Sequence, residues 1–328
     1  MTYINYMSNS YNGHLCIVFA LEHYNPLNMI RAFGENGINP VYISVKRRYE
    51  VACRSKYISK LHRVDSVEEG YKLLMEEYGN MEKKPYIVFS DDKSVGYFDL
   101  HYDEWKDKFI TYNAGRVGRI NEFMDKYNIQ QLAKKHGFNV LDSYVIGKED
   151  PLPEQLWYPI ITKDISPNSG SWKGDVFVCQ NEEELKESIK KITSPLIMIQ
   201  HFVDKQNEMA LEGYTINRGK DMQIITQMTW KYLIQGYYSP FHNVCMFTDK
   251  EMEHKLQAMF EEIGFEGVFE VEFLIDKDGT FYFMETNFRA SAWNPTCKFA
   301  GMPLDYLWVK GMENGYIDPA DRRVFEPF

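Results

Sequence analysis

Apolar runs alternate with amphipathic stretches through the first third of the chain. The runs LCIVFAL at 15–21, NPVYISV at 39–45 and YIVFS at 86–90 predict strands that are buried on both faces. Helical periodicity predicts helices at 26–37, which starts with Pro and ends with Gly, and at 67–79. This alternation predicts a parallel sheet with helices on both faces, and ligands bind such sheets at the C-terminal ends of the strands.

The pattern changes after residue 118, where shorter elements follow one another. Helical periodicity predicts one helix at 119–136 and another at 249–264. Between them we expect strands at 142–147, 158–164, 175–180 and 196–203, a helix at 182–192, and long antiparallel strands within 208–238. The predicted organisation is an N-terminal α/β domain at 1–118, a central α+β part at 119–201 and a C-terminal α+β part at 202–328.

The stretch VFEVEFLIDKDGTFYFMETNFR at 268–289 predicts a β-hairpin with carboxylates inside its strands. Asp278-Gly279 is a strong signal for a two-residue turn, which would pair Lys277 with Thr280. Counting outward from that turn pairs four polar residues across one face: Glu272 with Glu285, and Glu270 with Asn287. The other face then takes the mostly apolar Val271, Phe273, Met284 and Thr286.

Facing carboxylates need an explanation because like charges directly opposite each other destabilise a sheet. A hard cation such as Mg²⁺ binds oxygen ligands and would neutralise the cluster. The alternatives are a solvated, charged strand face, which is common on antiparallel sheets, or a pairing register that is shifted by one residue.

Composition limits the partners of the protein. Lys and Arg number 37 and Asp and Glu number 47, for a net charge of −10, which argues against general binding to nucleic acid or to anionic membranes. Apolar residues at 44% and aromatic residues at 15% predict a packed globular protein. The five cysteines are scattered, and the early apolar run is too short to cross a membrane, so we expect reduced thiols and a cytoplasmic location.

Several enzyme classes lack their sequence signatures in this chain. No G-x-S-x-G, Walker A or G-x-G-x-x-G motif occurs, which disfavours a serine hydrolase, a P-loop enzyme and a dinucleotide oxidoreductase. His201 and His242 are isolated in the sequence, so zinc ligation is not expected of them.

The order of elements at 119–300 and the acidic hairpin resemble the ATP-grasp superfamily, and within it carboxylate-amine ligases such as D-aspartate ligase and D-alanine-D-alanine ligase. The resemblance implies two ATP-grasp subdomains behind an N-terminal pre-ATP-grasp domain. In that family an acidic residue on one strand and E-x-N on the next hold Mg²⁺, or alternatively Mn²⁺, against the phosphates of ATP. Glu272, Glu285 and Asn287 match those positions, whereas Glu270 has no role in the resemblance.

The resemblance also implies an ATP site in the central part. Lys163, which ends the strand YPIITK, and Lys126 match two lysines that contact the nucleotide, although from the residues alone each could be an ordinary solvated lysine. The loop SPNSGSWKG at 166–174 resembles the flexible phosphate cover, with Ser169, Gly170, Ser171 and Lys173 as the contacts. The segment IMIQHFVDKQNE resembles the hinge strand that reads adenine, with Gln200 where relatives often carry Glu, Val203 at the ring edge and Glu208 on the ribose.

Arg289 follows two residues after Asn287, in N-F-R where many relatives have N-P-R. An arginine there could stabilise a phosphate or an oxyanion by bidentate hydrogen bonds, although a structural ion pair is an alternative. Arg289 and Lys173 are therefore the expected catalytic residues. For the substrates, the strand ends suggest Glu22, Asn25 and Asp91 as groups that recognise an ammonium or carboxamide, with Arg31 for a carboxylate.

The implied reaction has two steps. A substrate carboxylate attacks the γ-phosphate of ATP to give an acylphosphate, and an amine then displaces phosphate to form an amide. The expected substrates are small carboxylates and amines such as amino acids, and a homodimer is compatible with the family. The rival functions are a bicarbonate-activating carboxylase or carbamoyl-phosphate-type enzyme on the same scaffold, and a nucleotide-binding module without catalysis.

Overall fold

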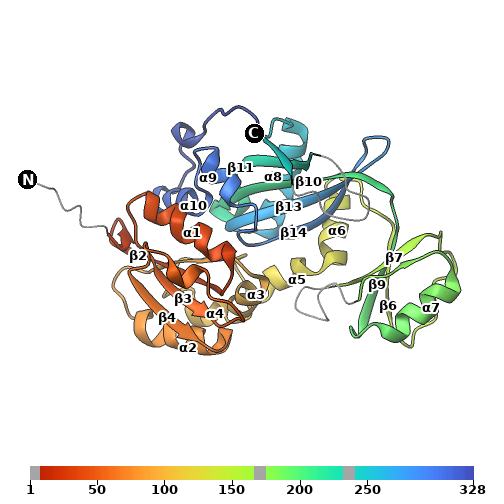
Figure 1. The fold of residues 1–328 in the computed structure, drawn as a ribbon, viewed down its shortest axis with the longest axis horizontal. Helices are drawn as coiled ribbons and strands as arrows, with labels where there is room; N and C mark the ends of the chain where they lie inside the picture. Colours follow the sequence, from red (N-terminus) through yellow and green to blue (C-terminus); the bar gives the residue numbers. More distant parts are fainter. Residues whose placement is uncertain (1–7, 166–174, 232–240) are drawn as a thin grey trace, which may run out of the picture.

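Three β-sheets organise the computed structural model, which describes residues 8–165, 175–231 and 241–328 (Figure 1). An N-terminal sheet lies at the lower left of the view, a large sheet at the upper centre and a small sheet at the right. Helices α5 (Arg119–Met124) and α6 (Lys126–Lys135) run between them.

The N-terminal sheet has a parallel core, as the sequence predicts. Its central strand β2 (His14–Leu21) pairs in parallel with β3 (Val41–Val45) on one side and with β5 (Tyr86–Phe89) on the other. Strand β4 (Lys60–Val64) extends the sheet beyond β3, and β1 (Ser10–Tyr11) pairs antiparallel with the start of β2. The helices of this domain are α1 (Tyr24–Glu35), α2 (Val67–Tyr78), α3 (Asp92–Leu100) and α4 (Tyr102–Trp105). The chain order reverses at β2, which is where ligands bind in open parallel sheets.

The predicted continuous helix at 119–136 is wrong, because the chain breaks at Asp125. The backbone of Asp125 is extended, with φ −67° and ψ 119°, and its side chain accepts a hydrogen bond from the amide of Asn128 at 2.9 Å. Asp125 therefore caps a new helix and places Lys126 in its first turn. The amide of Lys126 donates to the carbonyl of Ile165 at 2.8 Å, which ties this helix start to the end of β7.

The small sheet has the order β6-β9-β7-β8 and carries one helix. Its strands are β6 (Ser143–Gly147), β7 (Ile160–Asp164), β8 (Val178–Cys179) and β9 (Leu196–His201), and its helix is α7 (Glu182–Lys191). These elements share a hydrophobic cluster of their own, made of Ile146, Ile160, Cys179, Leu185, Ile192, Ile197 and Ile199.

The large sheet is antiparallel and has the order β12-β11-β10-β13-β14. Its strands are β10 (Lys205–Ile216), β11 (Asp221–Trp230), β12 (His242–Cys245), β13 (Gly267–Asp276) and β14 (Phe281–Asn287). Helix α8 (Lys250–Ile263) precedes the hairpin, and α9 (Pro295–Phe299) and α10 (Leu304–Asn314) follow it. Short 3₁₀ turns lie at Ala52–Arg54, Asn217–Gly219 and Pro319–Asp321.

The N-terminal domain and the large sheet share one hydrophobic core. Trp308 of α10 packs edge-on against Tyr112, with ring centroids 4.9 Å apart. The same cluster includes Phe89 of β5 and Phe269 of β13. Within the described residues no helix combines the length and the apolar character needed to cross a bilayer.

The β13–β14 hairpin reaches the predicted register by a different route. Asp276 and Thr280 close a three-residue loop, in which the amide of Asp276 donates to the carbonyl of Thr280 at 3.1 Å, so the predicted two-residue turn is wrong. A bulge at Met284 then shifts the pairing by one residue, since Phe273 pairs with Phe283 but Glu272 pairs with Glu285. The turn error and the bulge cancel. Phe283, not Met284, takes the core position opposite Phe273.

Candidate functional site

One face of the large sheet gathers carboxylates from three strands. Glu270 and Glu272 of β13 lie directly across from Asn287 and Glu285 of β14, which confirms the predicted pairing. On the other side of β13, Glu212 of β10 lies across from Glu270. Because side chains alternate along a strand, Glu208 belongs to this same face. The acidic face therefore consists of Glu208, Glu212, Glu270, Glu272, Glu285 and Asn287.

Lys126 and Asn287 hold the centre of the acidic face together. Lys126 Nζ lies 3.3 Å from Glu285 Oε2. Asn287 Nδ2 donates to Glu270 Oε2 at 3.0 Å and to Glu272 Oε1 at 3.1 Å. The charge of Glu285 raises the pKa of Lys126. Burial by itself would raise the pKa of Glu285, but the charges of Lys126 and Lys163 outweigh burial and lower it. Glu285 is therefore an ionised carboxylate beside a charged lysine.

Among the described residues, no lysine or arginine forms an ion pair with Glu272 as Lys126 does with Glu285. Burial and the neighbouring charges of Glu270 and Glu285 raise the pKa of Glu272 well above the usual range of a glutamate. Two carboxylates and an amide oxygen form a ligand set that suits a hard divalent cation, and such a cation would remove the repulsion that raises this pKa. Within the described ranges no three His, Cys, Asp or Glu side chains converge on one point as a metal site. The set at Glu272, Glu285 and Asn287 contains two carboxylates only, so its fit rests on donor chemistry and position.

Arg289 joins the acidic face to the N-terminal domain. Its Nε lies 3.3 Å from Asp92 Oδ1 on α3, and its Nη1 lies 3.4 Å from Glu270 Oε2. The next residue, Ala290, donates its amide to the carbonyl of Phe89 at 3.2 Å. The C-terminal end of β5 therefore meets the segment after β14. Burial opposes the charged form of Arg289, but the acids around it raise its pKa, so it stays a fixed positive charge.

Lys163 lies at the end of β7 and is tied to Gln200. Its Nζ donates to Gln200 Oε1 at 2.9 Å. Burial, with the positive charge of Lys126 added to it, lowers the pKa of Lys163 to about 8. Gln200 is 1% exposed, so its amide is held inside the protein.

The remaining residues of the predicted nucleotide site lie along the connection from β9 to β10. Val203 lies in the short loop between these strands and is half-buried. Glu208 of β10 pairs with Lys205 through a side-chain hydrogen bond, and Lys205 Nζ lies 4.4 Å from the ring centroid of Trp230. The predicted contacts Ser169, Gly170, Ser171 and Lys173 lie outside the described residues.

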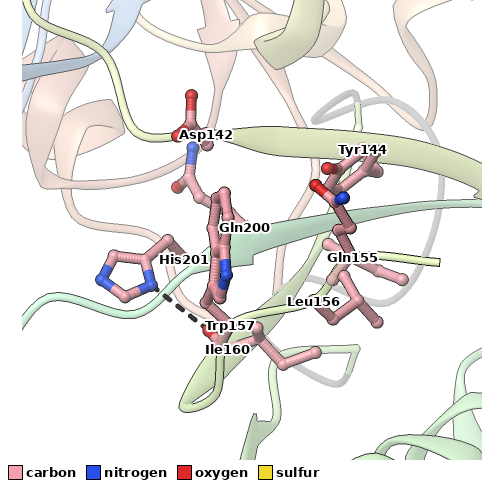
Figure 2. Close-up of a pocket in the computed structure, with 9 residues that line it drawn as sticks. Asp142, Tyr144, Gln155, Leu156, Trp157, Ile160, Gln200 and His201 are labelled. Atoms are coloured by element: carbon pink, nitrogen blue, oxygen red, sulfur yellow. Dashed lines mark hydrogen bonds between the residues drawn. The ribbon is translucent and has the colours of Figure 1, made fainter. Parts of the chain in front are cut away.

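A recess lies beside Gln200 at the end of the small sheet (Figure 2). The side chains that line it are Asp142, Tyr144, Gln155, Leu156, Trp157, Ile160, Ile199, Gln200 and His201. His201 Nδ1 lies 3.4 Å from the carbonyl oxygen of Trp157 in its wall. Because the recess adjoins Gln200 and not the acidic face, it does not by itself mark where a substrate binds.

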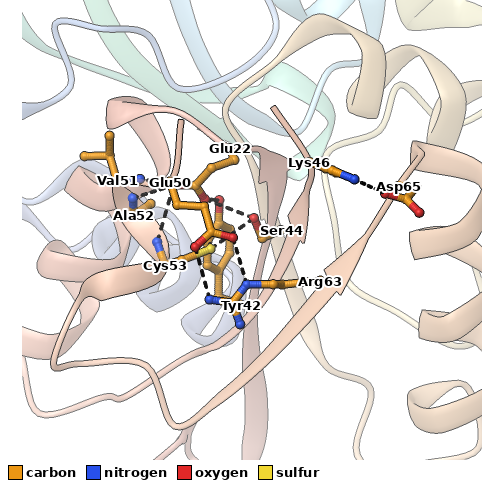
Figure 3. Close-up of polar contacts among 10 residues, drawn as sticks. All are labelled: Glu22, Tyr42, Ser44, Lys46, Glu50, Val51, Ala52, Cys53, Arg63 and Asp65. Carbon is orange, nitrogen blue, oxygen red and sulfur yellow. Dashed lines mark hydrogen bonds and ion pairs between the residues drawn. The ribbon is translucent and has the colours of Figure 1, made fainter. Parts of the chain in front are cut away.

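Two of the four predicted substrate residues of the N-terminal domain, Glu22 and Asp91, accept hydrogen bonds from within the protein. Glu22 accepts hydrogen bonds from Tyr42 Oη at 2.7 Å, from Ser44 Oγ at 3.0 Å, and from the amides of Val51 and Ala52 at 2.6 Å each (Figure 3). These contacts fix the loop after β3, and they outweigh burial and lower the pKa of Glu22.

Asp91, Asn25 and Arg31 occupy different environments. Asp91 caps α3 by accepting the amide of Ser94 at 2.8 Å, and it also accepts the amide of Leu21 at 2.9 Å. Asn25 lies in the first turn of α1, and its Oδ1 is buried without a hydrogen-bond partner in the described structure. Arg31 is exposed on α1. A role in substrate binding stays a prediction for all four residues.

Three residues of the site were missed by reasoning from sequence. Glu212 is 0% exposed, and its Oε1 accepts a hydrogen bond from Ser291. Asp92 orients Arg289, and Gln130 bonds to Gln200. The alternation of β10 would have placed Glu212 on the face of Glu208, but the pairing of β10 with β13 is not visible in the sequence.

Comparisons with known proteins agree with this arrangement. No protein-family model matches the chain. It is 28% identical over 172 residues to a D-alanine–D-alanine ligase of Fusobacterium nucleatum, which covers 50% of this chain and 55% of the relative. It is also 26% identical over 171 residues to an N5-carboxyaminoimidazole ribonucleotide synthase of Staphylococcus haemolyticus, covering 51% of this chain and 44% of the relative. The chain thus spans about half the length of the curated relatives it matches.

Solved structures share the fold over nearly the whole chain. An L-amino acid ligase from Bacillus licheniformis has a TM-score of 0.73 at 12% identity, covering 95% of this chain and 78% of the ligase. The biotin carboxylase domain of a Hydrogenobacter thermophilus 2-oxoglutarate carboxylase, in complex with MgADP and bicarbonate, has a TM-score of 0.69 at 15% identity, covering 95% and 73%. The acidic face and its lysines therefore lie on a fold that this chain shares with ATP-grasp proteins.

Proposed function

We propose that the protein is an ATP-dependent carboxylate-amine ligase. The observation that carries this proposal is the acidic face, on which Glu272 lies across from Glu285, with Asn287 beside them and Lys126 at 3.3 Å from Glu285. The residues fit a Mg²⁺-nucleotide, since they combine oxygen ligands for the cation with lysines for the phosphates. When bound, Mg²⁺ supplies positive charge that offsets the charge of the phosphates.

The side chains of this protein position the reactants and contribute charge. A carboxylate oxygen of the acid attacks the γ-phosphorus of ATP, the bond to ADP breaks, and an acylphosphate forms. The amine nitrogen then attacks the acyl carbon and phosphate leaves, which gives the amide. Lys126 and Lys163 hold the phosphates of ATP. Arg289, which Asp92 and Glu270 fix in place, stabilises the phosphate or the oxyanion that forms in the reaction.

The similarity to a D-alanine–D-alanine ligase and the fold of an L-amino acid ligase support amino acids as substrates. A bicarbonate-activating function is the second candidate. It is supported by the similarity to an N5-carboxyaminoimidazole ribonucleotide synthase and by the shared fold with a biotin carboxylase domain. A cytoplasmic location, the substrate contacts in the N-terminal domain and a homodimer stay predictions.

ADP release by the purified protein with Mg-ATP tests the proposal. The reaction is run with pooled amino acids and small carboxylic acids, each with and without bicarbonate, and with hydroxylamine to trap an acylphosphate as a hydroxamate. Release that needs an acid, yields a hydroxamate and rises with an amine supports the ligase. Release that needs bicarbonate alone supports the second candidate, and no release in any pool contradicts both.

A further inference from the structure

A line of three hydrogen bonds runs through the interior from the small sheet to the large sheet. Lys163 Nζ donates to Gln200 Oε1, Gln200 Nε2 donates to Gln130 Oε1, and Gln130 Nε2 donates to the backbone oxygen of Met284, each at 2.9 Å. Both glutamines are 1% exposed. We call Lys163, Gln200, Gln130 and the Met284 carbonyl the amide relay.

The chemistry of the two ends fixes the direction of the amide relay. An ammonium group can only donate, so the oxygen of Gln200 must face Lys163. A backbone carbonyl can only accept, so the nitrogen of Gln130 must face Met284. The middle bond then follows, because the remaining nitrogen of Gln200 meets the remaining oxygen of Gln130. Neither amide can turn over without breaking two hydrogen bonds in a buried place, which is costly.

The neutral amide at position 200 is required by this arrangement. Gln200 accepts from Lys163 and donates to Gln130 at the same time. An ionised glutamate, the residue that relatives of this family often carry there, accepts only and would leave Gln130 Oε1 without its donor. The departure from the family pattern at Gln200 is thereby matched by a partner on α6.

The far end of the amide relay meets the acidic face. Met284 is the bulged residue of β14, and the next residue is Glu285, which pairs with Lys126 at 3.3 Å. Lys126 and Gln130 both belong to α6. Helix α6 therefore contacts the hairpin at two neighbouring points and contacts the end of β7 through Gln200.

We propose that Gln130 is a positioning residue that orients Gln200 and, through it, holds Lys163 at the nucleotide phosphates. This proposal rests on the proposed function, because it assigns Lys163 to ATP. Within the described part of the chain, Gln200 takes one of the three N–H donors of Lys163, so two can serve a nucleotide. In this proposal Gln130 acts on the nucleotide only through Gln200.

Gln130→Met tests the proposal, with Mg-ATP affinity measured by calorimetry. Methionine keeps the length and helix propensity of glutamine but removes both hydrogen bonds. We expect the affinity for Mg-ATP to fall on the order of tenfold, because Gln200, the acceptor of Lys163, is then no longer held in its orientation. Gln223→Met is the matched control. Gln223 is a glutamine of β11, 3% exposed, whose oxygen accepts from Tyr214 at 2.9 Å, so its loss should lower the melting temperature but leave ATP affinity unchanged.

A double-mutant cycle separates positioning from a general structural effect. Gln200→Glu keeps an acceptor for Lys163 and removes the donor to Gln130, so Gln130→Met should change ATP affinity by less than about twofold in that background. An equal loss in both backgrounds would overturn the proposal, as would wild-type affinity in Gln130→Met. If Gln130→Met does not fold, Gln130→Leu replaces it with the same expected loss, because leucine also removes the acceptor for Gln200 and keeps high helix propensity.

Failure of the proposed function has a different signature. A wild-type protein that binds no Mg-ATP overturns the proposed function and the assignment of Lys163 together. A wild-type protein that binds Mg-ATP, with an unaffected Gln130→Met variant, overturns only the role of Gln130.

Discussion

At the scale of single residues, charge around the acidic face is unevenly compensated. Glu285 has Lys126 at 3.3 Å, and Glu270 has Arg289 at 3.4 Å. Glu212 and Glu272 are held by hydrogen bonds to Ser291 and Asn287, which carry no charge. Burial and neighbouring acids raise the pKa of both glutamates well above the usual range. The carboxylates of the acidic face therefore repel one another, and a bound cation would reduce this repulsion.

Glu285→Gln should lower ATP turnover on the order of 100-fold or more while the fold remains intact. The substitution keeps the size of the side chain but removes the negative charge that would bind the metal and that pairs with Lys126. Turnover is measured against Mg²⁺ concentration, with circular dichroism as the test of folding. Glu262→Gln is the control, because Glu262 pairs with Lys135 and His136 away from the acidic face. Near-normal turnover in Glu285→Gln would contradict the metal assignment.

We expect Lys163 to give the affinity for ATP a pH dependence. Its pKa of about 8 means that the side chain is charged below that value and neutral above it. The dissociation constant for ATP should therefore rise roughly tenfold between about pH 7 and about pH 9. Lys163→Arg remains charged and should remove this dependence, and Lys163→Ala should bind on the order of tenfold more weakly at neutral pH. Equal pH profiles for the wild type and Lys163→Arg would show that Lys163 does not contact the phosphates.

At the scale of elements, local patterns predicted the strands and the acidic pairing, but not how the pairing is reached. The Asp-Gly signal located the connection between the strands but not its length of three residues. The bulge at Met284 was hidden because nothing in FYFMETN marks one residue as extra. The strand β4 and the helices α3 and α10 were also not predicted. In β4 (KLHRV) charged residues interrupt the apolar pattern, which hides a strand stabilised mainly by its pairing with β3.

Gly279→Ala should destabilise the hairpin by about 1 kcal/mol without changing activity. Gly279 has φ +79°, and a Cβ there would meet nothing within 4 Å, so the cost is backbone strain alone. Gly279→Asn should cost less, since asparagine tolerates this conformation better. Chemical denaturation measures both, and a cost for alanine no greater than that for asparagine would contradict the assigned loop geometry.

At the scale of the whole molecule, hydrophobic packing divides the chain unevenly. The N-terminal domain and the large sheet share one core, whereas the small sheet and α7 have a separate cluster of seven buried residues. The amide relay and the contact of Lys126 with Ile165 connect the small sheet to that larger body. The sequence could indicate the elements of each part, but Asp92 and Gln130 contact residues of other parts, and Glu212 contacts Ser291, which is distant in sequence. Such contacts follow only from the assembled fold.

This division predicts two levels of hydrogen-exchange protection. A small core stabilises a unit less than a large one, so backbone amides at 143–165 and 175–201 should exchange faster than those of β2, β10 and β13. Mg-ATP should slow the exchange of those two segments, because a nucleotide held by Lys163 and by the acidic face would link the small sheet to the large one. Mass spectrometry with and without Mg-ATP measures this. Uniform protection without nucleotide would contradict the two-part energetics, and protection confined to the N-terminal domain on adding Mg-ATP would place the nucleotide elsewhere.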